Sequence, residues 1–261
     1  MAKRALLVGI NQYANSKFNL RGCVNDSESL AHLLVTTYGF NGGDIDILRD
    51  SAATRATIMS RLETLLSSAQ AGDTIVFGYS GHGTQARSTD SSEPDVKDEC
   101  LVPYEATYGS LIRDDELYVL FNRYVNEQLK FTAIYDCCHA GTLYRTFAID
   151  EHDNIVEDVI NRCLPIEDLL ALTTRDSTIG PYNVLSACKD DQTAADLREA
   201  GPERVPRGAF SYALHNFLAA SRDVPVALAD PQIAALISAV SSHTQTPSYQ
   251  MIDLNAPLIR Y

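Results

Sequence analysis

Residues 73–83 read Asp-Thr-Ile-Val-Phe-Gly-Tyr-Ser-Gly-His-Gly, an apolar run that ends in a histidine between two glycines. Because the run does not alternate with polar residues, it predicts a strand buried on both faces, as in a parallel sheet. A second run of this kind, Phe131–Tyr135, is followed by Asp-Cys-Cys-His-Ala-Gly at 136–141. Active sites of parallel sheets lie at the carboxyl ends of the strands, which is where both polar segments fall.

Strand-like and helix-like segments alternate along the rest of the chain. Runs of mostly apolar residues predict further strands at 4–10 and 183–187, and alternation predicts a short strand at 44–48. Helical spacing of apolar residues predicts helices at 24–38, 54–69, 114–125, 209–220 and 230–241. We therefore expect a single domain over residues 1–261 of the α/β class, a three-layer α/β/α sandwich with a mostly parallel central sheet.

Three segments have a weaker pattern. The polar, acidic stretch 84–99 predicts a mobile loop, and the stretches 100–104 and 111–112 predict a small hairpin. The stretch 142–182 carries scattered charge without strong periodicity, so we expect a long excursion there with a weak helix at 165–172.

The composition excludes several classes of protein. With 45% hydrophobic and 21% charged residues, the chain of 261 residues is not disordered. Its net charge of −13 argues against nucleic acid and anionic membranes as partners and favours basic ones. No segment is long and apolar enough for a membrane span, and the apolar run 5–10 is too short for a signal peptide. The six cysteines have no regular spacing, so we expect a reduced, cytoplasmic protein.

A histidine and a cysteine follow the two central strands. A cysteine becomes a strong nucleophile when a nearby histidine takes its proton, and His82 and Cys138 would meet if their strands are neighbours. The backbone N–H groups of Gly83 and Cys138 would then face a substrate carbonyl as an oxyanion hole. Alternation along an extended strand puts Asp136 and Cys138 on one face and turns Cys137 into the packing.

Other interpretations of these residues stay open. The same alternation turns His139 away from Cys138, which leaves His82 as the base, but a histidine and a cysteine of this kind are often only structural. A zinc site of Cys137, Cys138, His139 and His82 fits tetrahedral geometry badly, because adjacent ligands are poorly placed and no C-x-x-C pair exists. The glycines beside His82 also allow a plain turn or a phosphate site, although the glycine-rich phosphate motifs are absent.

The motifs resemble those of the caspase-like cysteine peptidases, and within them the metacaspases, called orthocaspases in prokaryotes. Residues 5–11 look like the first strand of that family, and 20–26 look like the entry to its first helix. Residues 79–85 resemble its histidine motif, 136–141 its cysteine motif, and 186–194 with 208–211 the start of its small-subunit part. The resemblance implies a large-subunit-like part at 1–141, an intervening loop region at 142–182 and a small-subunit-like part at 183–261. The separation of His82 and Cys138 fits the roughly 50 residues typical of caspases.

The resemblance also implies the chemistry and its specificity. Cys138 would be the nucleophile and His82 the general base and acid, acting through an acyl-enzyme that water hydrolyses. Asp26 and Asp136 match positions that line the S1 pocket, so the expected substrate is a protein or peptide with Arg, or Lys, at P1. Without the resemblance, Asp26 would be a helix-start residue and Asp136 a strand-end turn former.

Calcium is a further expectation from the resemblance, because many metacaspases need it. Asp98, Asp114 and Asp115 match three of the four aspartates of their calcium cluster, and Arg145 stands where the fourth is expected. An arginine there would neutralise the three carboxylates. We therefore expect no cofactor for the chemistry and a weak or absent dependence on calcium.

Relatives in this group often cut themselves between their large and small parts. The candidate sites here are Arg175, which we expect to be the most exposed, together with Arg162 and Arg145, and further along the chain Arg204 and Arg207.

The main expectation is an endopeptidase that cleaves after Arg or Lys. The alternatives are a catalytically idle interaction module, a zymogen that needs a partner, and a relative that cuts after a different residue. Because no prodomain precedes Arg4, we expect the activator or inhibitor to be a separate protein or ligand, and we expect a monomer.

Overall fold

The structure is a computed structural model that describes residues 1–87, 96–137, 145–149, 155–163, 173–174, 180–189, 192–221, 223–253 and 255–259. Its central sheet has the strand order β14-β11-β7-β3-β1-β2. These strands are β1 (Lys3–Gly9), β2 (Ile45–Arg49), β3 (Thr74–Ser80), β7 (Lys130–Asp136), β11 (Asn183–Ser186) and β14 (Ser248–Gln250). Every neighbouring pair is parallel except β11 and β14, which pair antiparallel at one edge. The predicted, mostly parallel sheet is confirmed.

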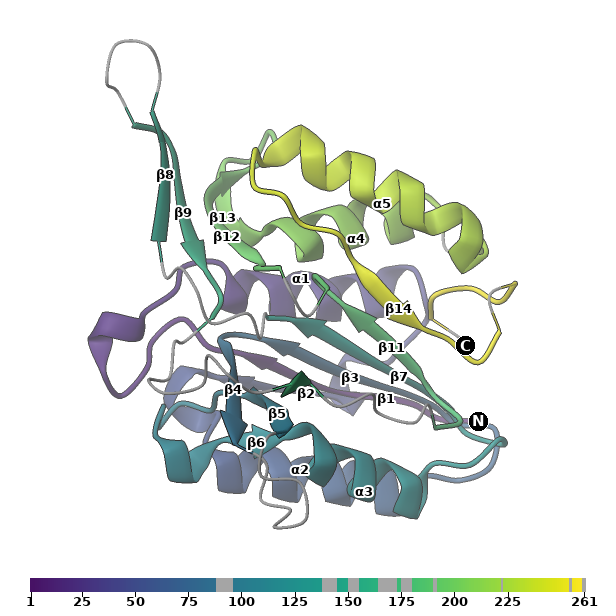
Figure 1. The fold of residues 1–261 in the computed structure, drawn as a ribbon. Helices are drawn as coiled ribbons and strands as arrows, with labels where there is room; N and C mark the ends of the chain where they lie inside the picture. Colours follow the sequence, from purple (N-terminus) through teal and green to yellow (C-terminus); the bar gives the residue numbers. More distant parts are fainter. Residues whose placement is uncertain are drawn as a thin grey trace.

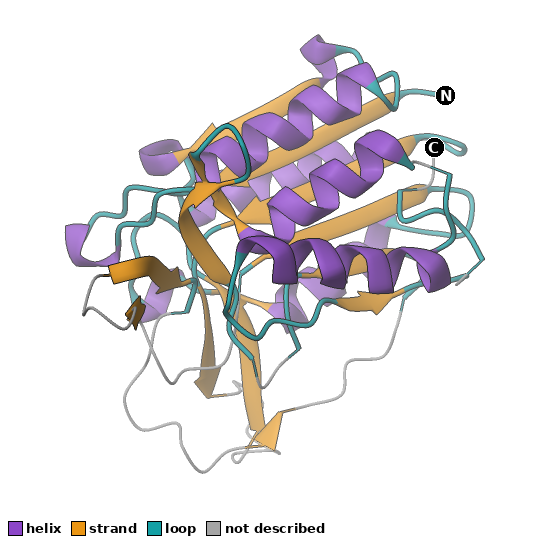
Figure 2. Cartoon of the chain, turned by 90° about the horizontal axis from the view of Figure 1, so that it is seen from above, coloured by secondary structure: helices purple, strands orange, loops and turns teal. Residues whose placement is uncertain are grey.

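Helices cover both faces of this sheet. One layer holds α1 (Cys23–Thr36), α4 (Ala209–Ala220) and α5 (Val226–Val240), and the other holds α2 (Arg55–Ser67) and α3 (Asp114–Tyr124) (Figure 1). Seen from above, the helices lie roughly along the direction of the strands (Figure 2). The three-layer α/β/α architecture is therefore confirmed. Short 3-10 helices lie at Ser16–Phe18, Gly42–Asp44, Asp50–Ala52 and Tyr108–Ser110.

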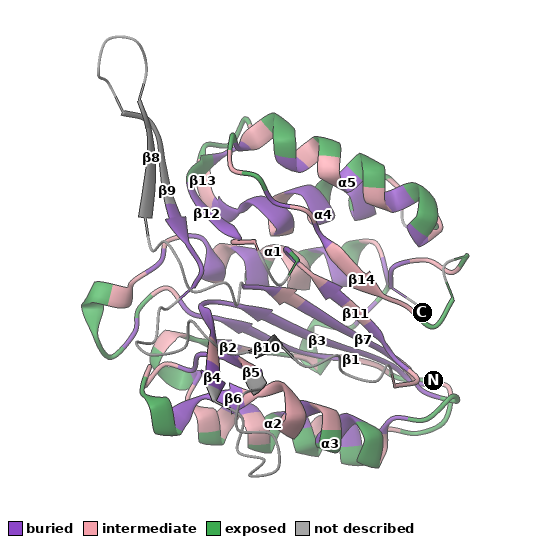
Figure 3. Cartoon of the chain, viewed as in Figure 1, coloured by how far each residue is buried: buried purple, intermediate pink, exposed green. Residues whose placement is uncertain are grey.

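Alternate residues of the central strands pack into two separate cores. In β1, Leu6 and Val8 join the core that contains residues of α2 and α3, whereas Ala5 and Leu7 join the core that contains residues of α1, α4 and α5. All four are at most 2% exposed, and Figure 3 shows the central strands largely buried along their length. Because successive side chains of a strand point to opposite faces, a sheet covered on both faces needs apolar residues at every position.

Two small sheets flank the carboxyl ends of the central strands. The first contains β4 (Gly83–Arg87), β5 (Val96–Leu101), β6 (Ile112–Arg113) and β10 (Thr173–Thr174). The second has the order β13-β12-β9-β8, with β8 (Arg145–Ile149), β9 (Ile155–Asn161), β12 (Ala195–Ala200) and β13 (Val205–Gly208). In Figure 1 the β8–β9 pair extends away from the central sheet beside β12 and β13.

The structure corrects the expected elements in three places. The prediction of a mobile loop at 84–99 is wrong for both ends of that range, where β4 and β5 pair as antiparallel strands. Their polar sequences do not indicate strands. The hairpin predicted for 100–104 and 111–112 is confirmed in the pairing of β5 with β6. The excursion at 142–182 contains strands, while the helix predicted at 165–172 lies outside the described residues.

Helix α5 begins at Val226 rather than at Asp230. In the predicted helix, Pro231 would lie in the first turn, where its missing backbone N–H costs nothing. In the structure the helix begins five residues earlier, so Pro231 lies inside it. Val226 and Ala229 are buried in the core, and this burial offsets the hydrogen bond that Pro231 cannot donate. Within the described part of the chain, no helix has the length and apolar character needed to cross a bilayer.

A substitution of Phe77, a fully buried residue of β3, tests how tightly its side of the central sheet is packed. Its side chain is 0% exposed and packs edge-on against the ring of Tyr135 on β7 at 6.0 Å. We expect Phe77→Ala to lower the free energy of unfolding by about 3–5 kcal/mol, measured by urea unfolding. Val119→Ala, at an exposed position of α3, is the matched control and should change it by less than about 0.5 kcal/mol. Equal effects of the two substitutions would contradict the assignment of Phe77 to a tightly packed core.

Candidate active site

The backbone of His82 is held on three sides just beyond the end of β3. Its N–H donates to the hydroxyl of Tyr13 at 2.8 Å, and its carbonyl accepts from the hydroxyl of Tyr79 at 2.7 Å and from the N–H of Val102 at 3.0 Å. A Cβ on Gly81 would lie 2.6 Å from the Tyr79 hydroxyl, which explains why this position is glycine. The turn after β3 is therefore built to fix the direction of the His82 ring.

The His82 ring is buried, and its tautomer follows from one contact. Its Nε2 lies 2.8 Å from the backbone carbonyl oxygen of Phe18. A carbonyl only accepts, so Nε2 carries the hydrogen and Nδ1 keeps its lone pair, as a general base requires. Burial, with a smaller contribution from the charge of Arg162, lowers the pKa of His82 to about 3, although hydrogen bonds to the backbone of Phe18 and Arg162 oppose the shift. The ring is therefore neutral at physiological pH.

The cysteine motif is only partly described. Cys138, the expected nucleophile and second oxyanion-hole donor, and His139 lie outside the described residues. The expectation for Cys137 is confirmed, since it is 2% exposed and belongs to the hydrophobic core that includes Tyr79. Burial raises the pKa of the Cys137 thiol well above its usual value, so this thiol is not a reactive thiolate.

The two aspartates predicted to line the S1 pocket meet around a guanidinium of the chain itself. Arg162 Nη2 lies 2.7 Å from Asp26 Oδ2, and its Nη1 lies 3.1 Å from Asp136 Oδ1. A third carboxylate, Asp196 Oδ1, lies 2.7 Å from Nη2, and Ser80 Oγ accepts from Nη1 at 2.7 Å. All five side chains are buried. The structure thus brings the two predicted aspartates together, and adds Asp196 and Ser80.

Further donors hold these carboxylates in place. Asp26 accepts from Arg207 Nε at 2.8 Å and from the N–H of Gly208 at 3.1 Å, so its role exceeds that of a helix-start residue. Asp136 accepts from the N–H of Ser211 at 2.9 Å. Burial raises the pKa of the Asp136 carboxyl, and the charge of Arg162 opposes that rise. A cation in this pocket therefore favours the ionised form of its carboxylates.

Backbone groups fix the third carboxylate as well. The N–H groups of Arg21 and Gly22 donate to Asp196 at 2.9 and 3.0 Å. A Cβ on Gly208 would lie 2.2 Å from Asp136 Oδ2 and 2.6 Å from Arg162 Nη1, so only glycine fits this wall of the pocket.

The predicted oxyanion-hole donor Gly83 also has a partner. Its backbone N–H donates to the carbonyl oxygen of Arg162 at 2.9 Å. The acidic pocket therefore binds the side chain of Arg162, and the N–H of Gly83 binds its main chain.

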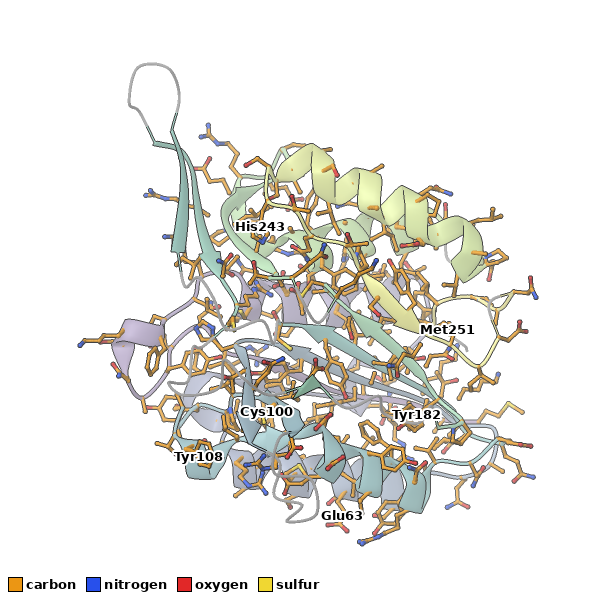
Figure 4. The ribbon with its side chains drawn as sticks, in the orientation of Figure 1. Glu63, Cys100, Tyr108, Tyr182, His243 and Met251 are labelled. Atoms are coloured by element: carbon orange, nitrogen blue, oxygen red, sulfur yellow. The ribbon has the colours of Figure 1, made fainter. Side chains whose placement is uncertain are left out.

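The predicted calcium ligands Asp98, Asp114 and Asp115 lie near one another, and one of them is paired with an arginine. Asp98 is 2% exposed and is paired with Arg113, whose Nη1 lies 2.6 Å from its Oδ2. Arg113 also lies over the ring of Tyr108, which is labelled in Figure 4. Burial and the nearby charges of Glu99 and Asp115 raise the pKa of Asp114 to about 7. Among the described residues, no group of three acidic, histidine or cysteine side chains is arranged to hold a metal ion.

Arg113 pairs with Asp98, a contact that the sequence did not indicate, and the neutralising role expected of Arg145 stays a prediction. Only the backbone of Arg145 is described, in β8. The zinc alternative gains no support from its two described members, since His82 Nε2 contacts the carbonyl of Phe18 and Cys137 packs in the core.

The candidate self-cleavage sites differ sharply in their surroundings. Arg162 is 0% exposed, and Arg207 is buried against Asp26. Arg204 is exposed and paired with Glu199. Arg175, expected to be the most exposed, lies outside the described residues.

Several residues of the site were not found from the sequence. Ser80 is the last residue of β3 and lies two residues before His82, so its place in the histidine motif offered a signal for it. Asp196 lies in the polar stretch after β11, without a pattern that marks it. The carbonyl of Phe18 and the hydroxyl of Tyr13 come from a loop some sixty residues before His82, and only the fold brings them there.

Comparison with solved structures defines the class of fold. Protein GSU0716 from Geobacter sulfurreducens superposes with a TM-score of 0.68 at 22% identity, over 96% of this chain and 93% of that one. The Drosophila initiator caspase Dronc gives 0.57 at 11% identity, over 98% and 81%. Caspase-1 from Spodoptera frugiperda gives 0.59 at 11% identity, over 96% and 86%. The fold is therefore that of the caspases.

Sequence comparison identifies the family within that fold. The model of the metacaspase peptidase C14 domain matches residues 3–146. Metacaspase-1 of Mycosarcoma maydis is 31% identical over 97% of this chain and 72% of its own length. Metacaspase-1 of Cryptococcus neoformans is 31% identical over 85% of this chain, and that of Schizosaccharomyces pombe is 30% identical over 81%. The chain belongs to the metacaspase family of caspase-like cysteine peptidases. It spans 56% of the length of the Cryptococcus neoformans relative and 58% of that of the Schizosaccharomyces pombe relative.

The burial of His82 predicts a pH dependence of stability. Its pKa falls from 6.5 in the unfolded chain to about 3 in the folded one, so the unfolded chain binds the proton more tightly between these values. The contribution is fully present above pH 6.5 and is lost as the pH falls toward 3. Between pH 7 and pH 5 we expect the parent chain to lose about 2 kcal/mol more unfolding free energy than His82→Gln.

Urea unfolding at the two pH values measures this difference, with Cys138→Ala in both chains to remove the expected nucleophile. An equal loss in both chains would contradict a buried, neutral His82.

Proposed function

We propose that this chain is a cysteine endopeptidase that cleaves protein or peptide substrates after Arg, and less efficiently after Lys. The observation that carries the proposal is a buried pocket that holds the guanidinium of Arg162, a residue whose main-chain carbonyl accepts from the N–H of Gly83. Three carboxylates surround this pocket, and among the residues described here two cations pair with them, Arg162 with all three and Arg207 with Asp26. An excess of negative charge of this kind attracts a cationic side chain and repels an acidic one.

The shape of the pocket favours Arg over Lys. The two terminal nitrogens of the guanidinium reach three carboxylates and a hydroxyl at once, and a planar fork is suited to that arrangement. A lysine ammonium is a single point charge on a longer flexible stem and would contact fewer of these groups.

In the proposed reaction, His82 acts through Nδ1 while Nε2–H remains on the carbonyl of Phe18. Cys138 gives its proton to His82, and its sulfur adds to the scissile carbonyl carbon. The N–H of Gly83 stabilises the developing oxyanion, with the N–H of Cys138 as the expected second donor. The proton moves from His82 to the leaving amine, and water then hydrolyses the acyl-enzyme with His82 as base.

A panel of fluorogenic peptides ending in Arg, Lys or Asp tests both the activity and the pocket. We expect cleavage after Arg, slower cleavage after Lys and none after Asp, because the pocket is lined by carboxylates. Cys138→Ala should lower kcat/KM by about 1000-fold or more. Asp136→Asn should lower it about 10- to 100-fold for the Arg peptide, as expected for a lost charge-assisted contact.

Asp46→Asn is the matched control, because it makes the same substitution at an exposed ion pair with Arg61. It should leave kcat/KM unchanged. Thermal unfolding of each variant separates loss of activity from loss of fold. A folded parent chain that cleaves none of the peptides would favour the idle interaction module.

Calcium should have little effect on this activity. Asp98 is already neutralised by Arg113, so a divalent cation would have to displace a buried ion pair. We expect less than about a twofold change in kcat/KM between chelator and added calcium. Activity that vanishes in chelator and returns only with calcium would contradict this. We keep a separate activating or inhibitory protein and a monomeric state as expectations.

A further inference from the structure

We propose that Gln245, a buried residue outside the acidic pocket, is a positioning residue that sets the preference of this pocket for Arg over Lys. The inference rests on the proposed function, since it takes the pocket as the place of a P1 side chain. It goes further by naming a residue, absent from the pocket itself, whose loss should change which cation the pocket prefers. Gln245 acts through the main chain that carries Asp196.

Both ends of the Gln245 amide are bound to main-chain groups. The residue lies in the connection between α5 and β14 and is 7% exposed. Its Nε2 donates to the carbonyl oxygen of Ala187 at 2.9 Å, and its Oε1 accepts from the N–H of Ala195 at 3.1 Å. Ala187 directly follows β11, and Ala195 is the first residue of β12. One side chain therefore ties the carboxyl end of a central strand to the start of β12.

Ala195 lies between two groups that hold an arginine in this structure. Asp196, the next residue, has its Oδ1 2.7 Å from Nη2 of Arg162. Ala194, the residue before, accepts from the backbone N–H of Arg162 at 3.0 Å. Gln245 therefore fixes the residue that separates the side-chain partner of this arginine from its main-chain partner.

Asp196 depends on such support more than the other two carboxylates of the pocket. Asp26 belongs to α1 and Asp136 to β7, which are regular elements of the three-layer core. Asp196 lies near the start of β12, in one of the small flanking sheets. Its carboxylate accepts from two backbone N–H groups just before α1, and Gln245 holds the main chain behind it. Functional side chains keep a precise geometry only when a surrounding shell of contacts fixes them.

The neighbours of Gln245 contact the same part of the chain. Nε2 of His243, which is labelled in Figure 4, lies 2.8 Å from the carbonyl oxygen of Thr193. The N–H of Thr246 donates to Oε1 of Gln192 at 2.8 Å, and Nε2 of Gln192 lies 3.3 Å from the hydroxyl of Thr246. The two bonds of Gln245 are the buried centre of this interface between the α5–β14 connection and the residues that lead into β12.

The position of Asp196 matters more for Arg than for Lys. One terminal nitrogen of the guanidinium contacts both Asp26 and Asp196, and the other contacts Asp136. Because the fork is planar and its nitrogens are a fixed distance apart, all three carboxylates must stay in place to bind it. A lysine ammonium is a point charge that needs fewer partners. A displaced β12 should therefore weaken the binding of Arg more than that of Lys.

A role in stability alone predicts a different outcome. Removal of Gln245 leaves a buried N–H and a buried carbonyl without partners, so both interpretations expect a less stable protein. Only the positioning role expects the ratio of kcat/KM between arginyl and lysyl substrates to change.

The substitution Gln245→Met tests this ratio. Methionine has a similar length and shape but lacks the two hydrogen-bonding groups. We expect kcat/KM to fall about tenfold or more for a fluorogenic arginyl peptide and less than about threefold for the lysyl peptide. The ratio of the two values does not depend on the fraction of each preparation that is active.

Two controls accompany this variant. Gln232→Met makes the same substitution at an exposed position of α5 and should leave both values unchanged. The rate at which iodoacetamide alkylates Cys138 reports on the cysteine and histidine without using the pocket, and it should change less than about twofold in Gln245→Met. The other five cysteines are buried, so peptide mass spectrometry assigns the label to Cys138.

A second variant decides the case if thermal unfolding shows that Gln245→Met does not fold. Gln192→Met removes the neighbouring bonds to Thr246 at a half-buried position. We expect it to lower the ratio of arginyl to lysyl cleavage about twofold or more, since it loosens the same connection. A parent-like ratio in this variant would then overturn the inference.

The outcomes separate this inference from the proposed function. If folded Gln245→Met keeps the parent ratio, or loses activity equally toward both peptides, Gln245 does not position the pocket and the peptidase remains. Slower alkylation of Cys138 with an unchanged ratio leads to the same conclusion. A parent chain that cleaves neither peptide overturns the proposed function and this inference with it.

Discussion

The structure depends on a buried guanidinium held by three carboxylates where its separate segments meet. Asp26 comes from the first turn of α1, Asp136 from the end of β7, and Asp196 from β12. None of these carboxylates would be stable at this depth alone, because burial raises the free energy of an unpaired charge. Arg162 compensates them, and Arg207 shares Asp26. A single electrostatic cluster thus ties the central sheet to the small sheet formed by β8, β9, β12 and β13.

The geometry of a parallel sheet explains why that cluster lies next to His82. In the register of the central sheet, Ser80 of β3 lies opposite Asp136 of β7, so the histidine and cysteine motifs begin at the same level of neighbouring strands. The strands are apolar along their length because helices cover both faces, which leaves polar chemistry only at the ends. The site is positioned by rigid strands, and the turn after β3 fixes the His82 backbone through Tyr13 and Tyr79.

The central elements were predictable because their signals are local. Helix α4 spans the predicted 209–220, and five of the six strands of the central sheet agree with predicted strands within one or two residues, whereas the edge strand β14 was not predicted. Burial of Cys137 followed from alternation alone. The paired strands β4, β5 and β9 were missed, since their polar sequences are stabilised by cross-strand hydrogen bonds and by distant partners rather than by an apolar face. The pairing of Asp98 with Arg113 was missed for a related reason, because an ion pair depends on positions in space that residue types do not encode.

By itself, the sequence determined the class of fold, the strand ends that carry the site, and the residues expected to do the chemistry. These properties depend on the period of the apolar residues and on short motifs, both of which are local. The tertiary structure alone decided what surrounds those residues. It placed the backbone carbonyl of Phe18 against Nε2 of His82, and it added Asp196 and Ser80 to the acidic pocket. It also turned Arg162, one of several arginines in a stretch without pattern, into the occupant of that pocket. Contacts between segments more than a hundred residues apart arise only when the whole chain packs, because they follow from the topology of the sheet and not from any neighbouring residue.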